Sequence, residues 1–572
     1  MMSICKRIFC LLLAAAAVLA GSAALAAGAA VPAADYAGVP VDLSAPETAP
    51  EGVFFSADGA AVTIASAGVY RLSGRLAGRL IVDADGEVEL ILAGVSLQGE
   101  ECLSIQSRDP VTLTLAPGGI NVLLDGALEP DESASAVIRS KAPLTIGGEG
   151  VLTVKAGGNN AILAKAGLTV AGGELHIYAA NHGLKSAGPL AITGGNITVS
   201  AGGDGLQAED GRVTSGAIEI SGGALNIVST GDGLQAQSAL TVSGGELSVT
   251  TGGGGGNAMN HSGGDMFAPR GWGQSASAQS DDISAKGLRG DGDITVSGGV
   301  IRLSTADDSL HCARLCTVAG GELSICSSDD AIHSDDMLVI SGGSIAVSDC
   351  FEGLEAFAIE IHGGAVRIYA VNDCINANGS EWGGGIDSVS GYDYTYFWQS
   401  GGSSDFVVYS TGGNMGDGVD SNGSAYITGG HLTVSTPGTF LENGIDSGFG
   451  NFIISGGEVL AGGASTMQET PSSTSEQCIA VVNTSVAAGS DICLYDAAGA
   501  ELWRYTLPNY ASCIIISHPG MTLGNTYTLA CGDAVTELDF AEKNSISVGG
   551  GGFGGMGGGF PGMGGGPGGR PF

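Results

Sequence analysis

The sequence has few basic residues and no long apolar stretch after its N-terminal segment, and each shortage excludes a class of protein. It contains 21 lysines and arginines against 59 aspartates and glutamates, which gives a formal net charge of -38. Nucleic-acid binding needs a basic surface for the phosphates, so we exclude nucleic acid as a partner and expect cations instead. No segment beyond the N-terminal one is long and apolar enough to span a bilayer, so we expect no membrane insertion.

The cysteines lack the spacing of a zinc site. Two of the 12 lie in the N-terminal segment, and none of the other ten forms a Cys-x-x-Cys pair. We interpret the five from Cys312 to Cys374 as buried or stacked thiols, whereas the four from Cys478 onward could form two disulfides, a choice that spacing leaves open. Aromatic residues are only 6% of the chain, but 100 glycines and a 44% hydrophobic content are typical of short strands joined by tight turns.

The composition also divides the chain into segments. Lys6 and Arg7 precede an apolar run and then small residues near Ala24, which predicts a secretory signal in residues 1–26 and an exported protein, secreted or at the cell surface. We expect a flexible lead at 27–50, repeated coils at 51–470 with a mobile insertion at 252–280, a small β segment at 471–548 and a disordered glycine-rich tail at 549–572.

An internal repeat dominates residues 51–470. Glycine pairs follow strands rich in Val, Ile and Thr, and their commonest step is 22 residues, as between positions 298, 320 and 342. One unit runs "LTVSGGELSV" (240–249), then a polar loop and a short third strand. A coil of this size cannot bury its apolar face alone, so the repeat predicts an all-β, single-stranded parallel β-helix, or solenoid, with strands stacked at about 4.8 Å. A leucine-rich repeat or a propeller would need a different signature.

Two polar columns follow when the units are aligned on the apolar residue that opens the third strand. The first column, two positions before that residue, sits at a bend and contains Asn160, His182, Asp204, Asp232, Lys286, Asp308, Asp330, Glu352, Asp373, Asp417 and Asn443. The second column, one position after it, contains Lys185, Gln207, Gln235, Arg289, His311, His333, Glu355, Asn376, Asp420 and Asp446.

A stack of carboxylates is unfavourable unless something neutralises it. Two like charges about 4.8 Å apart repel by roughly 1 kcal/mol in water and by roughly 3 to 4 kcal/mol at an effective dielectric of 20. Lys286 and Arg289 can compensate locally, but few bases lie near the later coils, where carboxylates and amides suit a hard cation. A single Asp can equally be a turn former. We predict a calcium site with ligands among Asp308, Asp330, Glu352, Asp373, Asn376, Asp417, Asp420, Asn443 and Asp446.

Two further groups of side chains stand out. His311 and His333 are neighbours in the second column, which could hold a metal but is more simply interpreted as a polar surface stack. The long step between the glycine pairs at 364 and 402 concentrates aromatic residues, which are good platforms for sugar rings but can also pack the loop onto the wall. The predicted sugar-binding residues are Trp382, Tyr392, Tyr394, Tyr396 and Trp398.

The motifs "NDCINANG", "GDGVDSNGSAYITGG" and "NGIDSGFGNFIISGG", with the later "AAGSDICLYDAAGAELWRY" and the Gly/Met-rich tail, resemble a known family. The chain is similar to secreted carbohydrate-binding β-helix domains that are pectate-lyase-like in fold, most strongly over residues 306–530 and little over the first 150. The resemblance implies a right-handed parallel β-helix with bound calcium that recognises plant cell-wall polysaccharide, such as cellulose or polygalacturonate.

Three functions remain open on these grounds. We expect a monomeric, non-enzymatic calcium-dependent polysaccharide-binding protein, with the cell wall as one setting. A pectate-type lyase would also need a basic group, and Arg302, Arg314 and Arg367 fit equally as solvated strand residues. A surface scaffold or adhesin would use the columns only to stiffen a rod.

Overall fold

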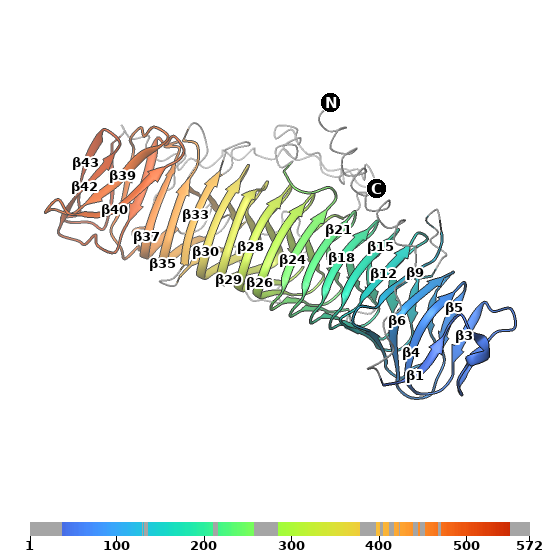
Figure 1. Ribbon diagram of the computed structural model, residues 1–572. Helices are drawn as coiled ribbons and strands as arrows, with labels where there is room; N and C mark the ends of the chain where they lie inside the picture. The colour runs from blue at the N-terminus through green and yellow to red at the C-terminus, as the bar shows by residue number, and fades with distance from the viewer. Residues whose placement is uncertain are drawn as a thin grey trace, which may run out of the picture.

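The protein is a long stack of β coils closed at its C-terminal end by a small β segment (Figure 1). The computed structural model describes residues 37–127, 130, 135–209, 216–256, 284–377, 396–400, 404–410, 417–421, 424–438, 444–446, 452–466 and 471–549. The predicted signal, insertion and tail lie wholly or almost wholly outside these residues. Strands of successive coils pair in parallel, which confirms the predicted β-helix.

Each coil contributes to three faces. Face 1, the predicted third strand, is formed by β3 (Ala61–Ile64), β5 (Arg79–Val82), β7 (Leu103–Ile105), β10 (Ile138–Ser140), β13 (Ile162–Ala164), β16 (Leu184–Ser186), β19 (Leu206–Ala208), β22 (Leu234–Ala236), β25 (Leu288–Gly290), β27 (Leu310–Cys312), the first residues of β29 (Ile332–Asp349) and β30 (Leu354–Ala370), β31 (Ile375–Ala377), β34 (Val419–Ser421) and β36 (Ile445–Asp446).

Faces 2 and 3 flank the Gly–Gly turn. Face 2 comprises β1 (Val39–Asp42), β4 (Gly68–Leu76), β6 (Val88–Gln98), β8 (Val111–Leu115), β11 (Leu144–Gly148), β14 (Leu168–Val170), β17 (Leu190–Ile192), β20 (Ile218–Ile220), β23 (Leu240–Val242), β32 (Tyr396–Gln399) and the first halves of β26 (Ile294–Thr305), β28 (Leu315–Ser327), β35 (Ser424–Ser435) and β37 (Phe452–Gly463), with the middle of β29 and of β30. Face 3 comprises β9 (Ile120–Leu124), β12 (Val151–Ala156), β15 (Glu174–Ala179), β18 (Asn196–Ala201), β21 (Ala224–Ser229), β24 (Glu246–Thr251), β33 (Ser404–Ser410) and the last parts of the long strands.

The apolar residues that align the repeat stand in register on face 1. Leu288 pairs with Leu310, Leu310 with Ile332, and Ile332 with Leu354. All four are fully buried, because side chains alternate between the interior and the surface along each strand. The interior is one continuous apolar cluster that runs from Val41 through the coils, so every coil buries its apolar residues against the coils above and below.

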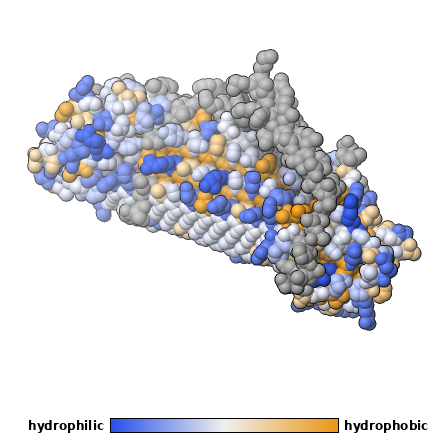
Figure 2. Space-filling model, viewed as in Figure 1, coloured by the Kyte–Doolittle hydropathy of each residue, from blue (hydrophilic) through white to orange (hydrophobic). Residues whose placement is uncertain are grey.

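The Gly–Gly turns between faces 2 and 3 stack into a ridge. The second glycine has a positive φ, for example +84° at Gly245, and a β-carbon there would lie 2.8 Å from the carbonyl oxygen of Gly223 in the preceding coil. Both the backbone conformation and the spacing of the coils therefore require glycine. Figure 2 shows an evenly stepped, pale strip along the rod, consistent with stacked residues of near-neutral hydropathy.

The N-terminal boundary differs from the prediction. Residues 39–42, placed in the flexible lead by sequence, form β1, which pairs in parallel with β4. Val41 is buried in the first coil, so this short alternating stretch adds a rung even though the residues around it are rich in Ala and Pro. A short hairpin strand, β2 (Val53–Phe55), and the 3₁₀ turn η1 (Pro46–Thr48) lie nearby at the same end.

The C-terminal segment covers the other end. β41 (Cys513–Ser517) pairs antiparallel with β37 of the last coil and with β38 (Ile479–Val482), which also pairs with β44 (Ser545–Val548). A separate four-stranded antiparallel sheet follows from β39 (Ser490–Tyr495), β40 (Glu501–Leu507), β42 (Thr526–Cys531) and β43 (Ala534–Asp539). The ten cysteines from Cys102 to Cys531 are free thiols, nearly all buried. Within the described residues, no helix is long and apolar enough to cross a membrane.

Candidate functional site

The first column lies at the bend that leads into face 1, and its carboxylates link neighbouring coils. Asp204, Asp232 and Asp308 each accept the backbone N–H of the column residue in the next coil, at 2.8–3.2 Å. Asp373 accepts the corresponding N–H of Asp417. These carboxylates are at least nine-tenths buried, so the column is part of the structure as well as a row of charges.

The second column lies on face 1 in continuous register from Arg289 through His311, His333 and Glu355 to Asn376. The register then continues to Asp420 and Asp446. Within a coil, a second-column side chain can reach the carboxylate of the first column: Gln207 Nε2 donates to Asp204 Oδ2 at 2.9 Å, and His311 Nδ1 lies 2.9 Å from Asp308 Oδ2. The identity of the second-column residue therefore decides how each carboxylate is compensated.

The two polar columns together form a ladder of polar side chains. Basic side chains neutralise the carboxylates in its middle coils. Lys286 Nζ contacts both Asp307, at 2.9 Å, and Asp308, and Arg289 lies 3.5 Å from Asp232. Burial alone would lower the pKa of Lys286, but the two aspartates raise it above its usual range. Burial opposes ionisation of Asp308, yet His311 and Lys286 lower its pKa. Asp308 was predicted as a calcium ligand, but here its charge is already paired.

The next two coils contain acids without this compensation. Among the described residues, no ion pair joins Glu352 or Asp373 to a basic side chain. Burial and the nearby Glu355 raise the pKa of Glu352 to about 7. Burial and the charges of Glu352 and Asp420 raise the pKa of Asp373 well above its usual range. Without a cation, these carboxylates are held ionised only at a cost in free energy.

This acidic group contains a buried side-chain oxygen that has no hydrogen-bond partner, which makes it a candidate ligand for a cation. Asn376 is 5% exposed, and its Nδ2 donates to Glu352 Oε2 at 2.7 Å, while its Oδ1 has no hydrogen-bond partner. Gln207 Oε1, at the equivalent face-1 position of an earlier coil, is also unpartnered, but Nε2 of the same side chain is shared between Asp204 and the amide oxygen of Gln235. At Asn376 the orphaned oxygen coincides with several carboxylates. The oxygen-only set of Glu352, Asp373, Asn376 and Asp420 fits a hard cation such as calcium.

The other predicted metal ligands are placed as follows. Asp330 is buried beside His333, Asp417 is buried at the bend of the next coil, and Asp446 lies half-buried in register with Asp420. Asn443 lies outside the described residues.

The predicted sugar-binding aromatics are only partly described. Trp382, Tyr392 and Tyr394 lie outside the described residues, and Tyr396 is in β32, with its side chain also outside the description. Trp398 is half-buried on the outer surface of β32, where its Nε1 donates to Thr428 Oγ1 at 3.0 Å. Its ring also meets His362 edge-on, with centroids 5.5 Å apart.

Sequence reasoning missed two partners of these groups. Tyr426 stands directly opposite Trp398 on the next rung and is also half-buried, so two aromatic side chains share one outer face. The step of 28 residues between these positions crosses an inserted loop, which hid their pairing. The histidines were predicted as a surface stack, and their rings are indeed adjacent, but each also contacts a first-column carboxylate. The i, i+3 spacing of Asp308 and His311 was the available signal.

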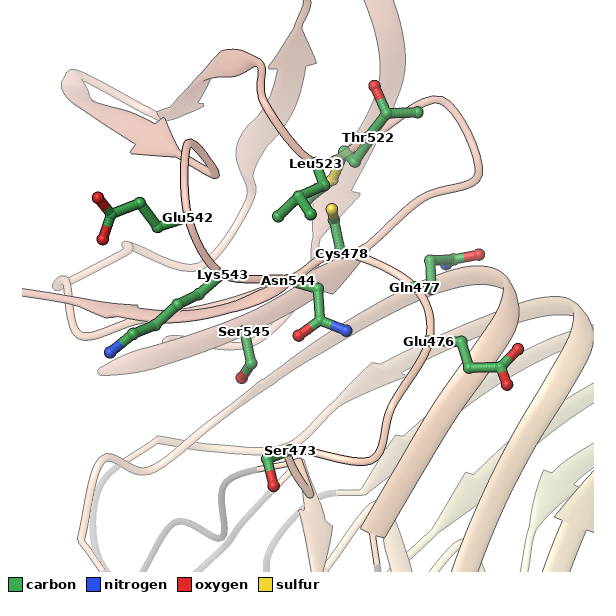
Figure 3. Close-up of a pocket in the computed structure, with 11 residues that line it drawn as sticks. Ser473, Glu476, Gln477, Cys478, Thr522, Leu523, Glu542, Lys543, Asn544 and Ser545 are labelled. Atoms are coloured by element: carbon green, nitrogen blue, oxygen red, sulfur yellow. The ribbon is translucent and has the colours of Figure 1, made fainter.

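A pocket of about 520 Å³ lies elsewhere, between the last coil and the C-terminal segment (Figure 3). Its wall combines Cys478, Met521 and Leu523 with the charged Glu542 and Lys543. None of its lining residues belongs to the two polar columns, so the pocket and the ladder are separate features.

Comparison with known proteins confirms the resemblance inferred from the motifs. A family model described as carbohydrate-binding domain-containing protein matches residues 58–331. The match lies further toward the N-terminus than the motifs indicated, and it includes coils in the first 150 residues. The matched residues consist of repeated strands and glycine turns, whereas the quoted motifs are confined to later coils.

Two individual proteins are also similar. A carbohydrate-binding domain-containing protein of Acetivibrio thermocellus is 34% identical over 150 residues, which is 24% of this chain and 45% of the relative. The chain therefore spans less than half of the length of this curated relative. A solved structure, a polysaccharide lyase-like protein from C. thermocellum determined as a gadolinium derivative, has 30% identity and a TM-score of 0.33, covering 37% of this chain and 90% of its own.

Proposed function

We propose that the protein is an exported, calcium-binding protein that binds polysaccharide of the plant cell-wall type, of the cellulose or polygalacturonate class. The observation that carries the proposal is the outward pair of Trp398 and Tyr426 on adjacent rungs, in the same two coils as Asn376 and Asp420. Aromatic side chains present large apolar area with polar edges, which suits the faces of sugar rings. The name of the curated relative and of the matching family supports a carbohydrate ligand.

Calcium would be held by Glu352, Asp373, Asn376 and Asp420, with Asp417 and Asp446 on the adjoining positions. The ion would neutralise the buried acids, and it could also attract an acidic sugar chain to a surface that is otherwise strongly negative. The fold holds the proposed ligand oxygens on three consecutive rungs of face 1. It places the aromatic pair on face 2 of two of the same coils.

The test is retention of the protein on polygalacturonate and on cellulose, in calcium and then in chelator, with unsaturated products followed in the same samples. We expect calcium-dependent retention without product formation. Trp398→Ala should weaken retention by about tenfold or more, as removal of a central aromatic anchor does in other interfaces. The matched control is Tyr369→Ala, because Tyr369 is an exposed aromatic on face 3 of the same β-helix.

The alternatives give different outcomes in this experiment. Product formation would identify a lyase instead of a binding protein. Calcium-dependent stability without retention on either polysaccharide would indicate a scaffold whose ladder only stiffens the rod. Equal loss of retention in the Tyr369 and Trp398 variants would contradict the assignment of the ligand to the β32–β35 surface.

A further inference from the structure

Two histidines form a stacked pair on face 1, upstream of the acidic coils. His311 and His333 occupy the same position on adjacent rungs, with ring centroids 4.8 Å apart and ring planes inclined by 34°. Their side chains are 22% and 25% exposed, so the outer edge of each ring is accessible to solvent. Imidazole nitrogen is a ligand for transition ions rather than for calcium.

The inner nitrogen of each ring is held by a first-column carboxylate. His311 Nδ1 lies 2.9 Å from Asp308 Oδ2, and His333 Nδ1 lies 3.0 Å from both Asp330 Oδ2 and Glu355 Oε2. Carboxylates can accept from Nδ1 of each ring, and Asp335 also faces Nε2 of His333, so a metal ion would bind Nε2 of His333 in place of a proton. Metal-bound histidines are typically oriented in this way by a carboxylate behind them.

The outer nitrogens face a shared carboxylate. Asp335 Oδ1 is 3.3 Å from His333 Nε2 and 3.9 Å from His311 Nε2, and Asp335 is exposed. Ligand atoms bound to zinc at about 2.0–2.1 Å in a tetrahedron are separated by about 3.3 Å, so the first distance already matches and the second is slightly long. The arrangement provides two imidazoles and one carboxylate, with solvent able to complete the coordination.

We propose that His311, His333 and Asp335 form a binding site for a divalent transition ion of the zinc class, with Asp308 and Asp330 as positioning residues. Carboxylates outnumber basic groups around the site: Asp307, Asp308 and Asp329 form a further acidic group, in which Lys286 contacts Asp307 and Asp308. This site uses different coils from the proposed calcium ligands. It assigns Asp308 and Asp330, predicted from the sequence as calcium ligands, to the orientation of the histidines.

The test is titration of the purified protein, kept in excess calcium, first with Co²⁺ and then with Zn²⁺. We expect visible absorption bands of tetrahedral Co²⁺ at one ion per chain, which Zn²⁺ then abolishes by displacement. Asp335→Asn should weaken zinc binding, and the double variant H311Q/H333Q should remove the Co²⁺ bands. Asp308→Asn should reduce zinc affinity by roughly 10–100-fold, as loss of a carboxylate behind a metal-bound histidine typically does.

His176→Gln is the matched control, because His176 also lies on an outer strand surface beside a carboxylate, Glu174, at 3.0 Å, but has no histidine on the next rung. Its zinc affinity should equal that of the unchanged protein. Unchanged Co²⁺ bands in H311Q/H333Q, or absence of binding by protein that still shows its normal β-sheet circular dichroism, would overturn the proposal and leave the histidines as partners of the carboxylates. Retention on polysaccharide is measured separately, so failure here is distinguishable from failure of the proposed function.

Discussion

At the residue scale, one side chain on each rung decides whether a buried carboxylate is paired or exposed to repulsion. The same bend geometry holds Asp308 and Asp373, but Asp308 is met by Lys286 and His311, whereas Asp373 is met by Glu352 and Asp420. The first environment lowers the pKa of Asp308, and the second raises that of Asp373. Function along the ladder therefore depends on neighbours that are a whole coil apart in sequence.

Asn376→Leu should weaken calcium binding. The substitution removes the unpartnered Oδ1 and leaves Glu352 without the hydrogen bond from Nδ2, while the apolar side chain keeps a similar volume. We expect at least a tenfold loss of calcium affinity, measured by isothermal titration calorimetry. Gln207→Leu is the control, because Gln207 is flanked on face 1 by Lys185 and Gln235, whereas Asn376 is flanked by Glu355 and Asp420. This variant should leave calcium affinity unchanged. Equal losses in both variants would contradict the placement of the ion.

In the presence of a chelator that removes calcium, the free energy of unfolding of the protein should fall as the pH rises. The folded state raises the pKa of Glu352 from its ordinary 4.5 to about 7, so it holds this proton more tightly than the unfolded chain does. The folded state therefore gains stability at low pH and loses it as the pH rises from about 4.5 through about 7. We expect the unfolding temperature in chelator to decrease across this range, and calcium to remove the decrease because it replaces the proton.

Glu352→Gln is the control for this pH dependence, since it removes one titrating group and should make the decrease in chelator smaller, with the remainder due to Asp373, whose pKa is also raised. An unfolding temperature that increases with pH in the chelated, unsubstituted protein would show that Glu352 is not the group in control.

At the scale of single elements, a repeated coil is a strand, a Gly–Gly turn, a second strand, a bend and a short third strand, and the turn tolerates least change. Its second glycine combines a left-handed backbone with close contact to the coil before it. The ridge of turns sets the spacing of the coils, and with it the spacing of the polar columns.

Gly245→Ala separates these two requirements when it is compared with Gly499→Ala. Both glycines have positive φ, +84° and +82°, but a β-carbon at Gly499 would meet nothing within 4 Å, whereas one at Gly245 would lie 2.8 Å from Gly223 O. The backbone strain alone costs roughly 1–2 kcal/mol, so Gly499→Ala should lower the free energy of unfolding by that amount. Gly245→Ala should lower it further, as measured by denaturant unfolding. Equal effects would mean that the coils can separate without cost.

At the scale of the whole molecule, β41 joins two cores. Cys513 and Ile515 on one surface of the strand belong to the core of the β-helix, and Ile514 and Ile516 on the other belong to the core of the C-terminal segment. β41 also covers the edge of β37, which would otherwise present unpaired backbone groups to other molecules. The C-terminal segment thus protects the last coil against edge-to-edge association with other molecules.

Ile515→Ala should destabilise this junction and promote self-association. Ile515 is 1% exposed, and truncation of such a side chain typically costs roughly 2–5 kcal/mol. We expect a lower unfolding temperature and larger particles in light scattering as the last coil becomes accessible. Val535→Ala is the control, because Val535 on β43 is 69% exposed and its truncation should change stability little. A monomeric Ile515 variant of unchanged stability would refute the capping role.

Much of the architecture was predictable because it follows from the local periodicity of the sequence. The 22-residue step, the glycine pairs and the alternating apolar residues specify coils that must stack, and the aligned residues Leu288, Leu310 and Ile332 are indeed in register. The first rung at Val39–Asp42 was missed because a four-residue strand is too short to show a period, and only its pairing with β4 defines it.

The sequence by itself determined the coil, its three faces and the two polar columns, since these follow from strand alternation and the repeat length. Only the tertiary structure decided which carboxylates are compensated. Lys286 reaches Asp307 and Asp308 one rung away, and His333 lies between Asp330 and Glu355 on consecutive rungs. The physical reason is that Coulomb interactions and hydrogen bonds depend on distance in space. The stacking of coils brings residues about 22 positions apart into contact, and inserted loops change that separation from coil to coil.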